Sequence, residues 1–135
     1  MPIYVLDTSA LLASLYEEPG KERVDEVLLA ETCLIGAVNL AEFSSKCADG
    51  GMGHAEIQTL IKDFDADVIE LDGHLAMETG LLRPLTRRAG LSLGDRACLA
   101  LAKSRQAIAL TADRDWTTLD PSLDIAVECV RPQDQ

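Results

Sequence analysis

Short apolar runs alternate with stretches of helical periodicity along the whole chain. The apolar runs have the length of buried strands, and they predict strands over residues 3–7, 33–35, 68–71, 107–111 and 125–127. Between them, apolar residues recur at the spacing of one helix face, which predicts helices over residues 8–16, 21–30, 37–48, 54–64, 75–88 and 93–105. Strands separated by helices indicate a parallel sheet with helices on both faces.

Helix-breaking residues agree with these boundaries. Pro19-Gly20 ends the first predicted helix, and Asp49-Gly50-Gly51 ends the third. Pro84 should kink or divide the helix over residues 75–88, because proline cannot donate a backbone hydrogen bond. No long linker or repeat interrupts the pattern. We therefore expect one domain over residues 1–135, with an α/β fold: a parallel sheet of four to five short strands flanked by helices on both faces.

Composition and charge narrow the function. The chain has 135 residues, enough to bury a real core, and is 47% hydrophobic and 26% charged, as in ordinary globular proteins. Its net charge of −11 argues against a protein that coats nucleic acid through a broad positive field. A metal-dependent nuclease remains compatible with this charge, because bound cations neutralise part of such a site.

The cysteines and the N-terminus suggest a reducing compartment. The four cysteines are far apart and form no CxxC pair, and Cys47 and Cys98 fall in apolar helical patterns where a thiol acts as a small hydrophobe. Residues 1–4 lack the basic start of a signal peptide, and no apolar run is long enough to cross a membrane. We therefore expect a cytoplasmic protein without disulfides or a membrane anchor.

Four carboxylates border or interrupt apolar segments: Asp7, Glu42, Asp95 and Asp113. Asp7 and Asp113 stand just past predicted strands, where parallel α/β sheets bind ligands, and Thr8 and Ser9 add hydroxyls that could hold a carboxylate or a water. Carboxylates gathered at one place raise each other's pKa unless a cation is present. Mg²⁺ and Mn²⁺ prefer such oxygen ligands. The sequence predicts a metal site if the fold brings these four together.

Each carboxylate also has a purely structural explanation. Asp7 is a good helix N-cap, Asp95 fits a Ser-x-x-Asp capping box, and Asp113 suits a turn between strand and helix. Glu42 could extend to solvent and pair with Lys46 one turn later. The sequence alone leaves both explanations open, and a cap can also be a ligand.

The segment Thr111-Ala112-Asp113-Arg114-Asp115-Trp116 carries a second acid beside the fourth carboxylate. One Asp in such a loop is ordinary turn chemistry. Two Asp residues flanking Arg114, with Thr111 before them, look more like a ligand cluster. We predict Asp113 as the primary ligand and Asp115 as the secondary one.

Four motifs in order resemble a known family. They are Leu6-Asp7-Thr8-Ser9, Leu40-Ala41-Glu42, Leu93-Gly94-Asp95-Arg96-Ala97 and Thr111-Ala112-Asp113-Arg114-Asp115-Trp116. In this order they resemble PIN-domain proteins, in particular the compact bacterial VapC-type toxin ribonucleases, over essentially the whole chain. No acidic position of the pattern is missing. Trp116 stands where the family often has Phe.

The resemblance implies a PIN-like α/β/α fold and a metal-dependent endoribonuclease that serves as the toxin of a toxin–antitoxin pair. The implied catalytic quartet is Asp7, Glu42, Asp95 and Asp113. The implied ligands of Mg²⁺ or Mn²⁺ are Asp7, Asp95, Asp113 and Asp115, supported by Thr8, Ser9 and Thr111. Such a metal activates water for attack on an RNA phosphodiester.

The charge of the chain and the resemblance together predict its binding partners. Substrate contact must come from local basic groups, and Arg96 and Arg114 adjoin the acidic motifs as expected RNA contacts. The three arginines within residues 83–88 either contact RNA or form a solvated face with Glu78. The resemblance also implies a cognate antitoxin whose basic segment enters the acidic groove, and a homodimer that could form through helices within residues 21–64.

Other functions fit the motifs less well. A receiver-type phosphoacceptor needs an acidic pair after the first strand and a late Lys, whereas this chain has a single Asp7 and Arg114. A haloacid-dehalogenase-type phosphatase needs Asp-x-Asp, which is absent here. His54 and His74 fall at predicted helix starts, as surface or capping residues. The remaining alternative is a catalytically silent PIN-like module that binds protein or RNA.

Overall fold

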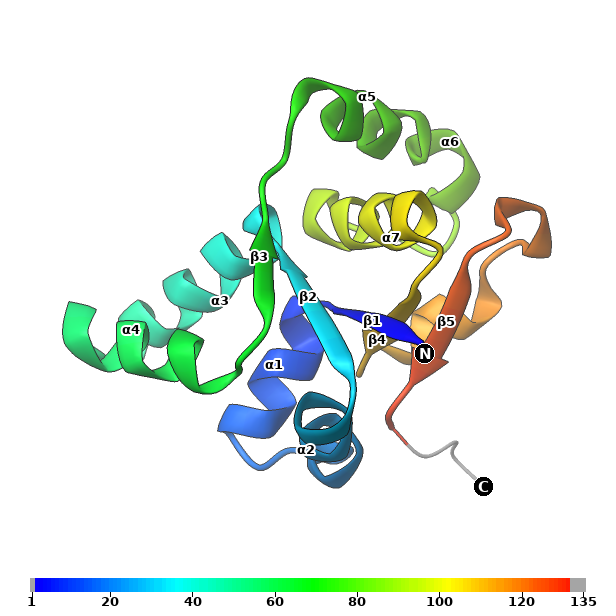
Figure 1. Ribbon diagram of the computed structural model, residues 1–135. Coiled ribbons are helices and arrows are strands. Elements are labelled where there is room, and N and C mark those ends of the chain that lie inside the picture. The colour runs from blue at the N-terminus through cyan, green and yellow to red at the C-terminus, as the bar shows by residue number, and fades with distance from the viewer. Residues whose placement is uncertain (1, 132–135) are drawn as a thin grey trace.

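A five-stranded parallel sheet forms the centre of the molecule, with helices on both faces (Figure 1). The computed structural model describes residues 2–131. The strands are β1 (Ile3–Leu6), β2 (Thr32–Gly36), β3 (Asp67–Ile69), β4 (Ile108–Thr111) and β5 (Ala126–Cys129). Their order across the sheet is β3-β2-β1-β4-β5, and each neighbouring pair is parallel. The predicted α/β/α fold is confirmed.

The helices also lie where the periodicity places them. They are α1 (Thr8–Leu15), α2 (Lys21–Ala30), α3 (Ala37–Asp49), α4 (His54–Asp63), α5 (Gly73–Leu81), α6 (Arg83–Thr86) and α7 (Leu93–Arg105), followed by the short 3-10 helices η1 (Arg114–Thr118) and η2 (Pro121–Leu123). The helix predicted over residues 75–88 is divided into α5 and α6. Pro84 lies in the first turn of α6, where its missing N–H leaves no intrahelical bond unmade.

Both faces of the sheet are buried, which explains why the strands read as continuous apolar runs. Val5 and Leu34 pack into the cluster under α5, α6 and α7. Tyr4, Leu6 and Ile35 pack into a second cluster with α1, α2 and α3. This division follows from the two-residue period of a strand, in which successive side chains point to opposite faces.

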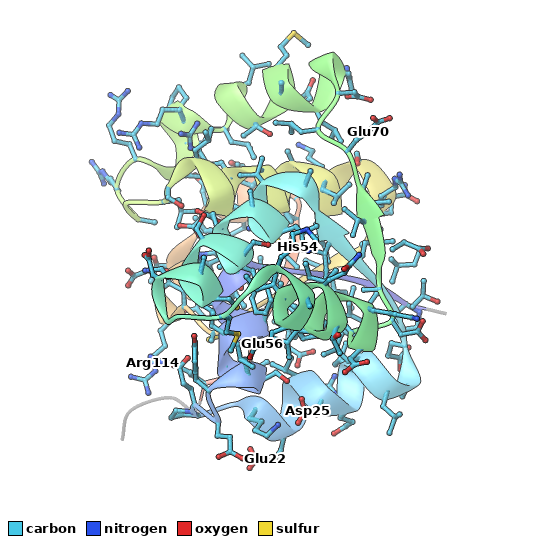
Figure 2. All side chains as sticks on the ribbon, turned by 90° about the vertical axis from the view of Figure 1, so that its left-hand side faces the viewer. Glu22, Asp25, His54, Glu56, Glu70 and Arg114 are labelled. Carbon is cyan, nitrogen blue, oxygen red and sulfur yellow. The ribbon has the colours of Figure 1, made fainter. Side chains whose placement is uncertain are left out.

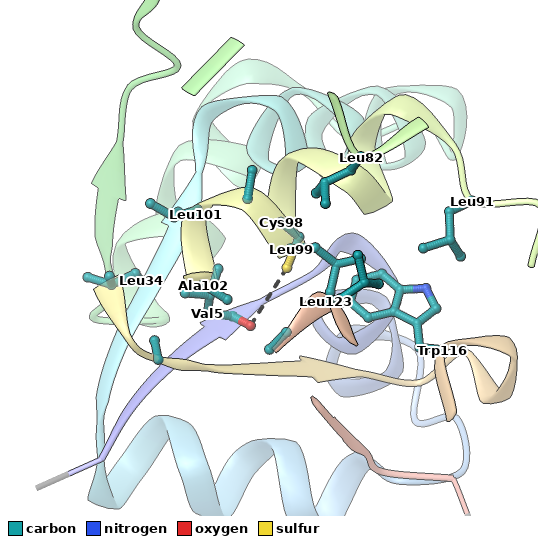
Figure 3. Close-up of a cluster of buried hydrophobic side chains, with 13 residues drawn as sticks. Val5, Leu34, Leu82, Leu91, Cys98, Leu99, Leu101, Ala102, Trp116 and Leu123 are labelled. Carbon is teal, nitrogen blue, oxygen red and sulfur yellow. Dashed lines mark hydrogen bonds between the residues drawn. The ribbon is translucent and has the colours of Figure 1, made fainter. Parts of the chain in front are cut away.

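The first cluster is centred on α7, which the sequence predicts as a largely apolar helix. Cys98 and Leu99 are fully buried there, and the Cys98 thiol lies 3.8 Å from the carbonyl oxygen of Val5 (Figure 3). Trp116 packs into the same cluster and fixes η1 to the core. All four cysteines are free thiols, as expected.

The order of the strands creates a switch point between β1 and β4. The chain leaves β1 toward β2 on one side of the sheet and later returns to β4 on the other. Ligands bind to such sheets at the carboxyl ends of the two strands at the switch point. Asp7 follows β1, its backbone N–H donates to the carbonyl oxygen of Leu110 at 3.1 Å, and Asp113 follows β4.

Across the described residues, we find no helix with the length and hydropathy of a membrane span.

Candidate functional site

Asp7 occupies the centre of the candidate site and is almost fully buried, with 1% of its surface exposed. It is the N-cap of α1, and its Oδ1 accepts hydrogen bonds from the Ala10 N–H at 2.9 Å and the Ser9 hydroxyl at 2.8 Å. The Oδ2 accepts from the Thr111 hydroxyl at 2.9 Å. The capping explanation is therefore correct, and it also orients the carboxylate at the switch point.

Burial raises the pKa of Asp7 to about 7 from its ordinary value of 3.8. Loss of hydration is the largest cause, the three hydrogen bonds act in the opposite direction, and the negative charge of Asp95 raises the pKa further. No cationic side chain among residues 2–131 bonds to this carboxylate. A buried carboxylate of this kind is stabilised by any cation that reaches it.

Ser9 and Thr111 connect Asp7 to the segment after β4. Their hydroxyl oxygens lie 3.2 Å apart, and Ser9 accepts a bond from the Ala112 N–H at 2.9 Å. The Thr111 hydroxyl accepts from the Asp113 N–H at 3.0 Å. Both hydroxyls thus hold the first and the last predicted motif together.

Glu42 projects from α3 toward α1 and α7 and is partly buried. Its Oε1 accepts a hydrogen bond from the Thr8 hydroxyl at 2.7 Å. It packs so closely on Gly94 that a Cβ at that position would overlap the carboxylate. The alternative pairing with Lys46 does not occur in the described structure. Thr8 therefore supports Glu42, whereas Ser9 supports Asp7.

Asn39 is a site residue that the sequence reasoning missed. It is 1% exposed, and its amide nitrogen lies 3.2 Å from both the Thr8 hydroxyl and the Gly94 carbonyl oxygen. It thereby fastens α3 to the starts of α1 and α7, on either side of Glu42. A polar residue one helical turn before Glu42 was a usable signal.

Asp95 forms the capping box that its sequence predicts. Its Oδ2 accepts from the Ser92 N–H at 2.9 Å, and its own N–H donates to the Ser92 hydroxyl at 3.2 Å. The charge of Asp95 also acts on the buried Cys98 thiol. Burial raises the pKa of that thiol, and the negative charges of Asp7, Asp95 and Glu42 raise it further. The charges of three of the four predicted carboxylates therefore act on this one buried thiol.

Asp113 and Asp115 lie in the turn that begins η1. Asp113 is partly buried, and its Oδ1 accepts from the Asp115 N–H at 2.9 Å, so the turn explanation is also correct. Asp115 is exposed. Asp113 is linked to Asp7 through its backbone N–H, which donates to the Thr111 hydroxyl that in turn donates to Asp7.

Within residues 2–131, no three His, Cys, Asp or Glu side chains stand close enough together to hold a metal ion. Asp95 and Asp113 each direct one oxygen to a local backbone N–H instead. The chemistry of the donors still fits a hard divalent cation, because they are carboxylates and hydroxyls around one buried acid without a countercharge.

Arg96, Arg114 and the two histidines lie on α7, η1, α4 and α5. Arg96 is partly buried and donates to the Thr79 carbonyl oxygen at 3.2 Å, which ties α5 to α7. Arg114 begins η1, and its side chain extends from the edge of the molecule (Figure 2). His54 and His74 are exposed on α4 and α5, in agreement with a surface role.

We expect the stability of the metal-free protein to fall as pH rises through the titration of Asp7. The folded state keeps its proton up to about pH 7, whereas the unfolded chain releases it near 3.8. The contribution of protonated Asp7 to the free energy of unfolding is therefore complete below about pH 4 and lost by about pH 7. It amounts to a few kcal/mol. Urea unfolding in EDTA across this range should show the fall in wild type. If Asp7→Asn shows the same fall, Asp7 is not its source.

Comparison with known proteins identifies one sequence family. A family model described as a PIN domain matches residues 4–120. No match is found among curated proteins. The matched range contains all five predicted acidic residues, from Asp7 to Asp115.

Solved structures with the same fold come from several bacteria. DNA-bound VapBC from Salmonella typhimurium has a TM-score of 0.72 and 20% identity, covering 96% of this chain and 99% of that chain. VapBC2 from Rickettsia felis, bound to a promoter DNA fragment, has a TM-score of 0.71 and 16% identity over 94% and 98% of the two chains. Mycobacterium tuberculosis VapC20, described as a sarcin-ricin loop cleaving toxin, has a TM-score of 0.68 and 12% identity over 84% and 92%. At these identities the likeness concerns the fold.

Proposed function

The chain belongs to the PIN-domain family, and on that basis we propose that it is a metal-dependent endoribonuclease of the VapC toxin type. The observation that carries the proposal is the buried carboxylate of Asp7 at the switch point, which pairs with no cationic side chain among residues 2–131 and whose pKa is raised by burial and by the charge of Asp95. The fold shared with VapC20, described as a sarcin-ricin loop cleaving toxin, supports RNA as the substrate class.

We assign the metal to the carboxylates that border the switch point. Asp7, Asp95 and Asp113 would hold Mg²⁺ or Mn²⁺, with Asp115 as an accessory ligand. When bound, such an ion acts as a Lewis acid that acidifies water and neutralises phosphate charge. Asp95 and Asp113 would exchange their local bonds to backbone N–H groups for this role.

The remaining residues orient the carboxylates, and one of them accepts a proton. Ser9 and Thr111 hold both oxygens of Asp7 in place. Glu42 has one oxygen fixed by Thr8, and we assign its carboxylate to accept a proton from the attacking water. Asn39 keeps Glu42 in register with the start of α7.

We propose a cognate antitoxin as the protein partner, because the solved neighbours include VapBC complexes and the acidic chain suits a basic inhibitory segment. We also propose one PIN domain over residues 1–135, a homodimer, and action in the cytoplasm, where RNA and free thiols coexist. A dimer contact is expected from the sequence within residues 21–64. In that range of the described structure, Leu29 is the large exposed apolar residue, whereas Met77, Leu81 and Leu85 are exposed on α5 and α6.

Metal removal tests the proposed activity. Purified protein should cleave RNA with Mg²⁺ or Mn²⁺, lose cleavage in EDTA, and regain it when the ion is restored in excess. Gel analysis of defined RNA oligonucleotides gives the readout. Cleavage that persists unchanged in EDTA indicates another nuclease in the sample. A complete lack of cleavage with either ion would favour the silent binding module.

A further inference from the structure

Positive charge is concentrated in one segment of this acidic chain. Half of its 12 Lys and Arg residues fall within residues 79–105, although the chain carries 23 Asp and Glu residues in total. These basic residues are Arg83, Arg87, Arg88, Arg96, Lys103 and Arg105. The segment contains a single acid, Asp95. It forms the end of α5, α6 and α7, which lie together on one face of the sheet (Figure 1).

The arginines that follow α6 are available for a partner. Arg87 and Arg88 are exposed, and neither forms an ion pair with an acid of residues 2–131. Lys21 and Arg23, on the opposite face of the sheet, are both paired with carboxylates. Nitrogen-tipped side chains gather at the α6 corner, at the upper left of Figure 2. Among residues 2–131, no ion pair joins these arginines to Glu78, so the solvated face that the sequence left open would still leave their charges available.

This corner leads directly into the candidate site. Four positions separate Arg88 from Ser92, the N-cap of α7, so the connection spans at most about 14 Å. Arg83 donates to the Leu91 carbonyl oxygen at 3.5 Å, which links α6 to this connection. Asp95 follows in the first turn of α7. One extended RNA strand can therefore reach both the arginines and Asp95.

We infer that Arg87 and Arg88 form a phosphate-binding surface that guides the RNA backbone to the start of α7. The inference rests on the proposed ribonuclease function and supplies the substrate attraction that a net charge of −11 otherwise opposes. Guanidinium groups pair well with phosphate oxygens. Contacts of this kind position a strand without reading its sequence.

A matched pair of double variants tests the surface. Arg87→Ala/Arg88→Ala removes two positive charges on the connection that leads to α7, and Lys103→Ala/Arg105→Ala removes two at the far end of α7, about 12–15 Å along the helix from Asp95. Binding of a single-stranded RNA oligonucleotide is followed by fluorescence anisotropy in EDTA over a salt series. The first variant should bind more weakly and lose about 1.4 from the slope of log K against log salt. In cleavage assays its KM should rise with kcat retained. The second variant should resemble wild type.

Three other outcomes decide against the surface, and a fourth separates the surface from the proposed enzyme. Equal weakening in both double variants would show a long-range field and overturn the inference. Normal binding by Arg87→Ala/Arg88→Ala would do the same while leaving the ribonuclease intact. A changed oligomer mass with unchanged RNA binding would assign this corner to contacts between two copies of the chain. RNA binding that depends on these arginines, without cleavage by wild type, supports the surface and overturns the proposed enzyme instead.

Discussion

Replacing Asp7 with Asn is expected to lower the rate of RNA cleavage by about 10³-fold. The substitution removes the buried negative charge on which the proposed metal site depends. The fold should persist, because Asn is also a good N-cap and its amide oxygen can accept the bonds that Ser9 and the Ala10 N–H now donate. Cleavage rates with Mn²⁺, together with circular dichroism, measure the two effects separately.

Asp72 offers a matched control for this substitution. It is the N-cap of α5, accepts a bond from the Leu75 N–H at 2.9 Å, and is exposed and distant in sequence from the site motifs. Asp72→Asn should cleave RNA at the wild-type rate. Equal activity of Asp7→Asn and wild type would contradict the assignment of Asp7, and equal loss in both variants would show that the effect arises from capping.

Replacing Gly94 with Ala is expected to reduce cleavage by about 10²-fold with little net change in stability, because the helix gain offsets the lost bond between Thr8 and Glu42. The new methyl group would occupy the space that the Glu42 carboxylate now fills, so Glu42 must move away from Thr8 and from the start of α7. Since Gly94 is helical, Ala should favour the helix by up to about 1 kcal/mol. Single-turnover cleavage and thermal unfolding of the same preparation give both readouts.

Gly80→Ala provides the corresponding control. Gly80 lies within α5 and has no atoms close to where its Cβ would be. This variant should gain about 0.5–1 kcal/mol of stability and keep wild-type cleavage. If Gly94→Ala also keeps full activity, the position of Glu42 against α7 is not needed for catalysis.

The fold could be predicted from sequence because its signals are local. A parallel sheet covered on both faces requires continuous apolar strands, and β1 and β4 have them. Pro84 could be placed at a break because its effect on the backbone does not depend on tertiary contacts. The switch point between β1 and β4 was harder to predict from sequence, because strand order depends on packing between distant segments.

The site was only partly predictable, because caps and ligands share residue types. Asp7 is the N-cap of α1 and Asp95 belongs to the capping box of α7, so both have a structural role, and burial of Asp7 distinguishes the two. Asn39 escaped prediction because its partners, Thr8 and Gly94, come from distant segments. The bond from Arg96 to Thr79 likewise depends on how α5 packs against α7.

The central hypothesis is that carboxylates from separate segments bind one divalent ion at the β1–β4 switch point. A crystal soaked in Mn²⁺ and measured near the manganese absorption edge locates that ion directly. We predict an anomalous peak within coordination distance of an oxygen of Asp7, with Asp95 and Asp113 turned toward it. A peak elsewhere on the protein, or none at this site under conditions that support cleavage, would contradict the proposed metal centre.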